Sequence, residues 1–143
     1  MRIKDVMRGK PSQTIVTVKP GDTVAQLLHV LAEHNIGAVV VTEDGKRIDG
    51  IISERDVVRH MGLNRELMDA PVQSIMTTEV HTCTPDVEVA ALAEEMTRQR
   101  FRHVPVLDDE GLMVGIVSIG DIVKHRISML QSERDQLENY IKQ

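Results

Sequence analysis

The chain of 143 residues has almost no aromatic side chains, with one Phe, one Tyr and no Trp. Its core must therefore be built from Val, Ile, Leu, Ala and Met, the apolar residues that remain. Its single cysteine, Cys83, cannot form a disulfide within the chain, so nothing requires an oxidising compartment. The sequence contains no long apolar run and no secretory signal, so we expect neither a membrane span nor export. A cytoplasmic protein is the expectation.

Basic residues are not in excess: 17 Lys and Arg stand against 22 Asp and Glu, a net charge of −5. A protein that binds free nucleic acid usually carries a basic surface, so we expect no nucleic-acid partner. The phosphate-binding loop Gly-x-x-x-x-Gly-Lys-Ser/Thr is also absent, which argues against nucleotide hydrolysis. The apolar content of 41% and the charged content of 27% are typical of a globular protein.

The sequence repeats itself. When the chain is shifted by 65 positions, residues 15–60 align with residues 80–125 without a gap, and 14 of the 46 positions are identical. Val6-Met7 also resembles Ile75-Met76, at an offset of 69. Internal repetition of this length predicts two copies of one structural unit. We divide the chain into residues 1–64, residues 65–126 and a C-terminal extension, residues 127–143.

Each repeat shows the same order of expected elements. Residues 16–18 alternate as a short strand, and Asp22 is a candidate N-cap for a helix whose apolar stripe is Val24, Leu27, Leu28 and Leu31. A β-branched run at residues 36–41, a turn at Asp44-Gly45 and a strand at residues 48–53 predict a hairpin. A second helix begins at Ser53. The predicted fold is α/β (α+β), with the unit β-α-β-β-α present twice.

The last helix is expected to continue far beyond the second repeat. Apolar residues recur at alternating spacings of four and three, as in a coiled coil, with Arg134 as the one interruption. The stripe comprises Val123, Ile127, Leu130, Leu137 and Ile141. An exposed helical tail and a dimer contact both remain open, and the apolar stripe favours the dimer contact.

Two such units, each carrying Gly-apolar-apolar-Ser-x-x-Asp, resemble a tandem pair of cystathionine-beta-synthase (CBS) domains, a Bateman module of the stand-alone type. The motif occupies residues 50–56 and 115–121, and the segment Arg102-His103-Val104-Pro105-Val106 is also typical of the family. The resemblance implies two repeats related by a pseudo-twofold axis. It also implies adenosine-containing ligands (AMP, ADP, ATP, NAD(H) or S-adenosylmethionine) in clefts between the sheets, and a homodimer shaped as a four-repeat disc.

Ser53 and Asp56 are the strongest candidate ligand-binding residues, with Ser118 and Asp121 as their counterparts. A helix N-terminus suits a phosphate, and a carboxylate can accept hydrogen bonds from two ribose hydroxyls. The same Ser-x-x-Asp pattern also caps a helix without any ligand. Arg55, Arg102 and His103 could meet phosphates, or form salt bridges on the surface. Small residues at Gly37 and Ala38 allow a base to approach the backbone. The resemblance adds the candidates Thr17, Val39, Thr82, Val104 and Pro105.

Metal and catalytic chemistry are not expected. The six histidines form no His-x-x-x-His pair, and one cysteine cannot build a structural zinc site. No motif around Cys83 would activate its thiol. The sequence predicts a non-catalytic module that binds an adenine nucleotide as an energy or cofactor sensor and signals to an unknown regulated protein. The alternative is a ligand-free structural or adaptor protein that dimerises through its repeats and its C-terminal helix; an enzyme is the least favoured.

Overall fold

The computed structural model describes residues 1–10 and 15–142. The first repeat contains the strand β1 (Thr17–Val18), the helix α2 (Val24–His34), the strands β2 (Ala38–Val41) and β3 (Gly50–Ser53), and the helix α3 (Glu54–Met61). Its sheet has the order β1-β2-β3, with β1 parallel to β2 and β2 antiparallel to β3. The hairpin turns at Gly45, whose φ of 79° lies in the region that glycine tolerates best. The predicted element order is confirmed.

The second repeat has the helix α4 (Val89–Gln99), the strands β4 (His103–Leu107) and β5 (Met113–Ser118), and the helix α5 (Ile119–Lys142). The strand expected at residues 81–83 is reduced to a single bridge between Cys83 and Val106. Pro105 stands where the first repeat has Val40, and proline has no N–H to donate to a neighbouring strand. The ladder between this segment and β4 is therefore shorter than its counterpart.

The N-cap of α2 differs from the prediction. Thr23 caps the helix: its Oγ1 accepts from the N–H of Gln26 at 3.2 Å, and Gln26 Oε1 accepts from the Thr23 N–H at 2.8 Å. Asp22 instead accepts from the N–H of Lys19 at 2.9 Å and stabilises the preceding turn. Both residues are good caps, and the glutamine three positions after Thr23 completes a capping box.

The chain has two hydrophobic clusters, the first formed around α2, β2 and β3 and the second around α4, β4 and β5. Each cluster is completed by a segment from the other half of the sequence. The N-terminal helix α1 (Ile3–Arg8) buries Ile3 and Val6 in the cluster of the second repeat, where it contacts β5 and α5. The short 3-10 helix η2 (Val72–Ser74), which follows η1 (Leu67–Asp69), places Val72 in the first cluster together with Ile75. This exchange agrees with the weak match between Val6-Met7 and Ile75-Met76. The division of the chain at residues 64 and 126 remains a prediction about the sequence repeats.

The apolar stripe predicted on α2 faces the first cluster, and the equivalent residues of α4 face the second. Val24, Leu27 and Leu31 of α2 are buried, and Leu28 packs partly buried against the same cluster. Val89, Leu92 and Met96 of α4 are buried in the second cluster.

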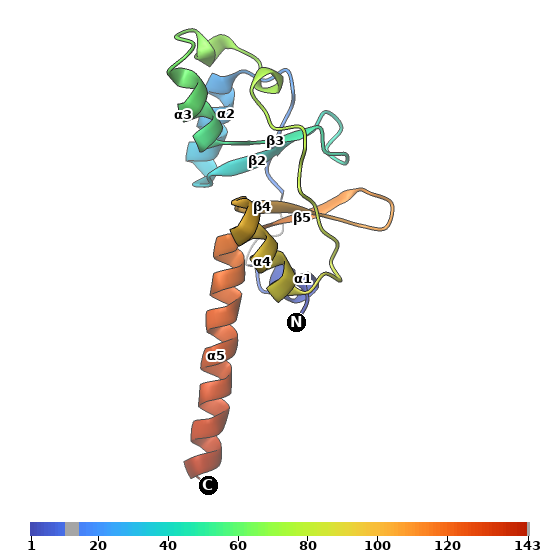
Figure 1. Ribbon diagram of the computed structural model, residues 1–143, viewed down its shortest axis with the longest axis vertical. Helices are drawn as coiled ribbons and strands as arrows, with labels where there is room; N and C mark the ends of the chain where they lie inside the picture. The colour runs from blue at the N-terminus through green and yellow to red at the C-terminus, as the bar shows by residue number, and fades with distance from the viewer. Residues whose placement is uncertain (11–14, 143) are drawn as a thin grey trace.

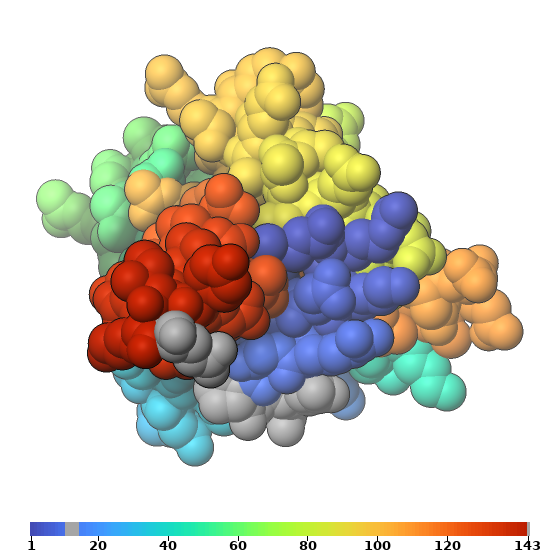
Figure 2. Space-filling view, turned by 90° about the horizontal axis from the view of Figure 1, so that it is seen from below, coloured from blue at the N-terminus to red at the C-terminus, as the bar shows by residue number. Residues whose placement is uncertain are grey.

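The helix α5 projects away from the globular body (Figure 1). Only its beginning is anchored, since Ile122 is its one buried residue among those described. Viewed from below, the helix is seen end-on beside the N-terminal segment (Figure 2). The predicted extension is confirmed, and it runs for 24 residues.

Candidate functional site

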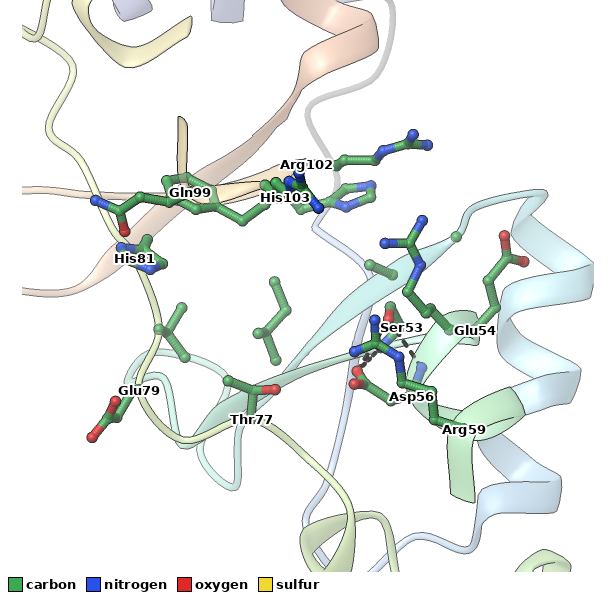
Figure 3. Close-up of a pocket in the computed structure, with 17 residues that line it drawn as sticks. Ser53, Glu54, Asp56, Arg59, Thr77, Glu79, His81, Gln99, Arg102 and His103 are labelled. Atoms are coloured by element: carbon green, nitrogen blue, oxygen red, sulfur yellow. Dashed lines mark hydrogen bonds between the residues drawn. The ribbon is translucent and has the colours of Figure 1, made fainter. Parts of the chain in front are cut away.

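A cleft of about 540 Å³ lies between the two repeats. One wall is the start of β2 and the N-terminus of α3, and the other is the segment before Cys83 together with the junction of α4 and β4 (Figure 3). Seven predicted site residues line it: Gly37, Ala38, Ser53, Arg55, Asp56, Arg102 and His103. The fold thus brings residues from both halves of the sequence to one cavity.

Ser53 and Asp56 cap the N-terminus of α3 at this cleft. Asp56 Oδ2 accepts from the Ser53 N–H at 2.8 Å and from Ser53 Oγ at 3.0 Å, while the Asp56 N–H donates to Ser53 Oγ at 3.3 Å. Both bonds to the carboxylate use Oδ2, so Oδ1 accepts no hydrogen bond from the residues that the structure describes. The capping interpretation of Ser-x-x-Asp is confirmed, and it leaves one carboxylate oxygen for a ligand.

Basic side chains come to the cleft from both walls. Arg55 and Arg59 belong to α3, and Arg102 and His103 lie on the opposite wall (Figure 3). Burial lowers the pKa of His103 below its usual value. The charge of Asp121 raises this pKa and the charge of Arg102 lowers it, but burial has the largest effect. Its imidazole is therefore neutral at pH 7 and can gain a proton when an anion approaches.

An aromatic pair forms part of the cleft wall. The rings of His81 and Phe101 are stacked with centroids 4.1 Å apart and an angle of 8° between their planes. These two residues were not predicted from the sequence. The same holds for other residues that line the cleft, namely Arg59, Thr77, Glu79, Gln99 and Arg100. Phe101 is the only Phe in the chain, and that rarity was the one signal that could have singled it out.

The counterpart of Asp56 in the second repeat has a different environment. Asp121 Oδ2 accepts from the Ser118 N–H at 2.9 Å and lies 3.1 Å from Lys10 Nζ, with both side chains about one quarter exposed. Lys10 Nζ also donates to the carbonyl of Ile116 at 2.7 Å. Burial raises the pKa of Asp121, but the Ser118 N–H and the Lys10 ammonium outweigh it and hold the pKa low. Asp121 is thus an ionised carboxylate that already has a cation beside it.

The remaining predicted residues lie outside this cleft. Thr17 is half-buried in β1 and Thr82 is exposed. Val39, Val104 and Pro105 are buried in β2 and β4. Ser118 and Asp121 cap the start of α5.

The chemistry of the other reactive groups is limited. Burial raises the pKa of the Cys83 thiol to about 11, with a smaller contribution from Glu95, so the thiol stays protonated at neutral pH. Among residues 1–10 and 15–142, no three His, Cys, Asp or Glu side chains gather as a metal site. Within the same residues, no helix has the length and apolar character needed to cross a membrane.

Sequence comparison matches the CBS domain to residues 3–63 and again to residues 72–128. The CBS domain-containing protein CBSX3 of Arabidopsis thaliana is 36% identical, over 97% of this chain and 71% of its own length. Inosine-5'-monophosphate dehydrogenase of Methanocaldococcus jannaschii is 31% identical over 85% of this chain, which spans 23% of that enzyme.

Solved structures of CBS proteins superpose on the chain. The CBS-domain containing protein ATU1752 from Agrobacterium tumefaciens has a TM-score of 0.81 and 40% identity, covering 88% of this chain and 99% of its own. The CBS domain pair of protein MJ0100, solved with 5'-methylthioadenosine and S-adenosyl-L-methionine, has a TM-score of 0.75 and 27% identity, covering 87% and 98%. The chain therefore belongs to the CBS domain family and carries two CBS repeats in tandem.

Proposed function

We propose that this CBS pair is a non-catalytic regulatory module that binds an adenosine-containing ligand, AMP, ADP, ATP or NAD(H), in the cleft between its repeats. The observation that carries the proposal is the cleft itself, which sets the free Oδ1 of Asp56 and the N-terminus of α3 opposite Arg102 and His103. A ribose and a phosphate require this combination of an acceptor and several cationic donors.

Each part of the ligand has a matching group. Asp56 accepts hydrogen bonds from the ribose hydroxyls, and Ser53 remains its capping partner. Arg55, Arg102 and His103 bind the phosphates, and the stacked rings of His81 and Phe101 offer an apolar edge to the adenine. The adenosine-containing ligands bound by the CBS pair of MJ0100 support this class of ligand.

The other predicted site residues belong to the same proposal. At the start of β2, Gly37 and Ala38 lie beside the adenine base. The buried residues Val39, Val104 and Pro105 support this site from within β2 and β4. Thr17, Thr82, Ser118 and Asp121 are assigned to a second cleft, in which the Lys10 ion pair makes binding weaker.

Binding in a cleft between repeats would report the ligand as a change in their relative position. The ligand contacts both walls at once, so it favours the arrangement in which the walls are closest. A regulated protein that contacts both repeats would sense this shift. We expect the module to act in the cytoplasm as a homodimer, and Val58 on α3, which is 73% exposed, is an apolar residue available for a disc interface.

Native mass spectrometry of the protein as purified tests the function directly. The proposal expects an adduct that denaturation releases and that fragments to adenine. A protein that remains free of adducts after incubation with millimolar AMP, ADP, ATP and NAD contradicts it. That outcome would favour the adaptor alternative, which the exposed apolar stripe of α5 supports.

The pH dependence of binding is expected to follow His103. In the free protein burial lowers the pKa of this histidine, while a phosphate beside it would raise the pKa in the complex. Between the two pKa values, binding takes up a proton, so the affinity increases as the pH falls through this window. Each unit by which the pKa of His103 differs between the free and the bound protein can change the Kd about tenfold.

Isothermal titration calorimetry at pH 8, 7 and 6, in buffers with different ionisation enthalpies, measures both the affinity and the proton uptake. The variant His103→Gln serves as the control, because it retains a hydrogen-bond donor that does not titrate. We expect the parent protein to take up a proton when the ligand binds, and we expect no such uptake in His103→Gln. Equal uptake in both proteins would assign the proton to another group.

A further inference from the structure

The part of α5 beyond the globular body has an apolar seam that remains exposed among the residues that the structure describes. Val123, Ile127, Leu130, Leu137 and Ile141 are each 49–79% exposed. They occur at alternating spacings of four and three, so they lie on one face of the helix. Exposing five aliphatic side chains to water is unfavourable, and a partner that buries them would remove this cost.

The position of Arg134 makes this seam self-complementary in one orientation. When two copies of α5 run antiparallel, Val123 faces the partner's Ile141, Ile127 faces the partner's Leu137, and Leu130 faces the partner's Arg134. Every residue of the seam then faces a residue of the partner helix. The two Arg134 side chains, one from each chain, lie in different layers of the coiled coil. The aliphatic part of each Arg134 side chain can cover Leu130 of the other chain, while its guanidinium reaches solvent.

The charges along the helix favour the same orientation. Lys124 and Arg126 lie near its start, whereas Glu133, Asp135 and Glu138 lie in its second half. An antiparallel pair sets these two regions opposite each other, with Lys124 beside the partner's Glu138. The two Glu133 side chains then lie near the centre of the pair, and each has the partner's Arg134 beside it. A parallel pair would instead oppose Arg134 with itself and Glu133 with Glu138, which like charges disfavour.

We propose that α5 binds a second copy of α5 in an antiparallel coiled coil centred between Leu130 and Arg134. This contact is separate from a disc formed by the CBS repeats and does not depend on ligand binding. It holds the globular bodies of the two chains at opposite ends of the helix pair. If the disc also forms, the two contacts together make a tetramer.

The mass of the assembly in solution tests the contact. Leu130→Glu is expected to halve the mass measured by light scattering, whether the parent is a dimer or a tetramer. The melting temperature of the globular body should not change, because Leu130 lies outside both cores. Ser132→Glu, on the opposite face of the helix, is the matched control and should keep the parent mass. A Leu130→Glu protein with the parent mass overturns the proposal.

Disulfide trapping tests the orientation. Cys83 can stay in place, because it is buried and its thiol has a pKa of about 11. Ile127→Cys and Leu137→Cys proteins, oxidised separately, are expected to remain uncrosslinked, while co-expression of the two should give a covalent dimer. Cross-linking of each variant with itself would show a parallel pair and overturn the antiparallel arrangement.

Discussion

Replacing Asp56 with asparagine is expected to weaken AMP binding by about 10- to 100-fold. The carboxylate offers Oδ1 to the ribose hydroxyls, and a hydrogen bond to a charged group contributes about 1.5–3 kcal/mol. Asparagine retains an oxygen that can accept from the Ser53 N–H, so α3 should keep its cap. The loss should therefore appear in the Kd measured by calorimetry and not in the melting temperature of the free protein.

Asp121→Asn is the comparison, since Asp121 occupies the equivalent position in the second repeat and is assigned only to the weaker second cleft. It lies outside the cleft and is already paired with Lys10. Its removal should leave the affinity of the cleft within about twofold, a change of less than 0.5 kcal/mol. Equal losses from the two variants, or a loss confined to Asp121→Asn, would place the ligand elsewhere.

Gly50→Ala is expected to destabilise the fold by about 1–3 kcal/mol, the usual range for overpacking. A Cβ at this position would lie 2.8 Å from the carbonyl oxygen of Thr77 and 2.7 Å from Met76 Sδ. The backbone of Thr77 cannot easily move, because it exchanges two hydrogen bonds of 2.9 Å with Ile51. The cost should appear as a lower midpoint of urea unfolding.

Gly115→Ala provides the comparison in the other repeat. Its Cβ would meet Met7 Cε at 2.6 Å, but this atom is the end of a flexible side chain that can turn away. We expect a smaller loss, about 1 kcal/mol or less, since Met adapts readily to changes in packing. A Gly115→Ala protein less stable than the Gly50→Ala protein would contradict this account of the two glycines.

This pair of glycines also illustrates what the sequence alone could predict. Gly50 and Gly115 were identified as part of a repeated motif, and the element order, the capped start of α3 and the long α5 followed from periodicity and capping residues. The reason for the glycines was not available from the repeat. Gly50 is needed because Met76 lies against it, and Gly115 because Met7 lies against it. These two methionines reach the glycines only because α1 and η2 each pack in the opposite repeat.

The candidate site was predictable to a similar extent. Ser53 and Asp56 stand in a local motif whose geometry is set by one turn of helix. The opposite wall of the cleft depends on how the two repeats are packed, which no local pattern encodes. His81 and Phe101 therefore emerged only with the structure, as did the contact of Lys10 with Asp121.

We propose that the cleft between the CBS repeats binds an adenosine-containing ligand through Asp56. Calorimetric titration of AMP into protein that has been unfolded, freed of small molecules and refolded tests it most directly. The account predicts saturable binding to the parent protein that is lost or strongly weakened in Asp56→Asn and retained in Asp121→Asn. Binding that is the same in all three proteins, or absent from the parent up to millimolar AMP, would contradict it.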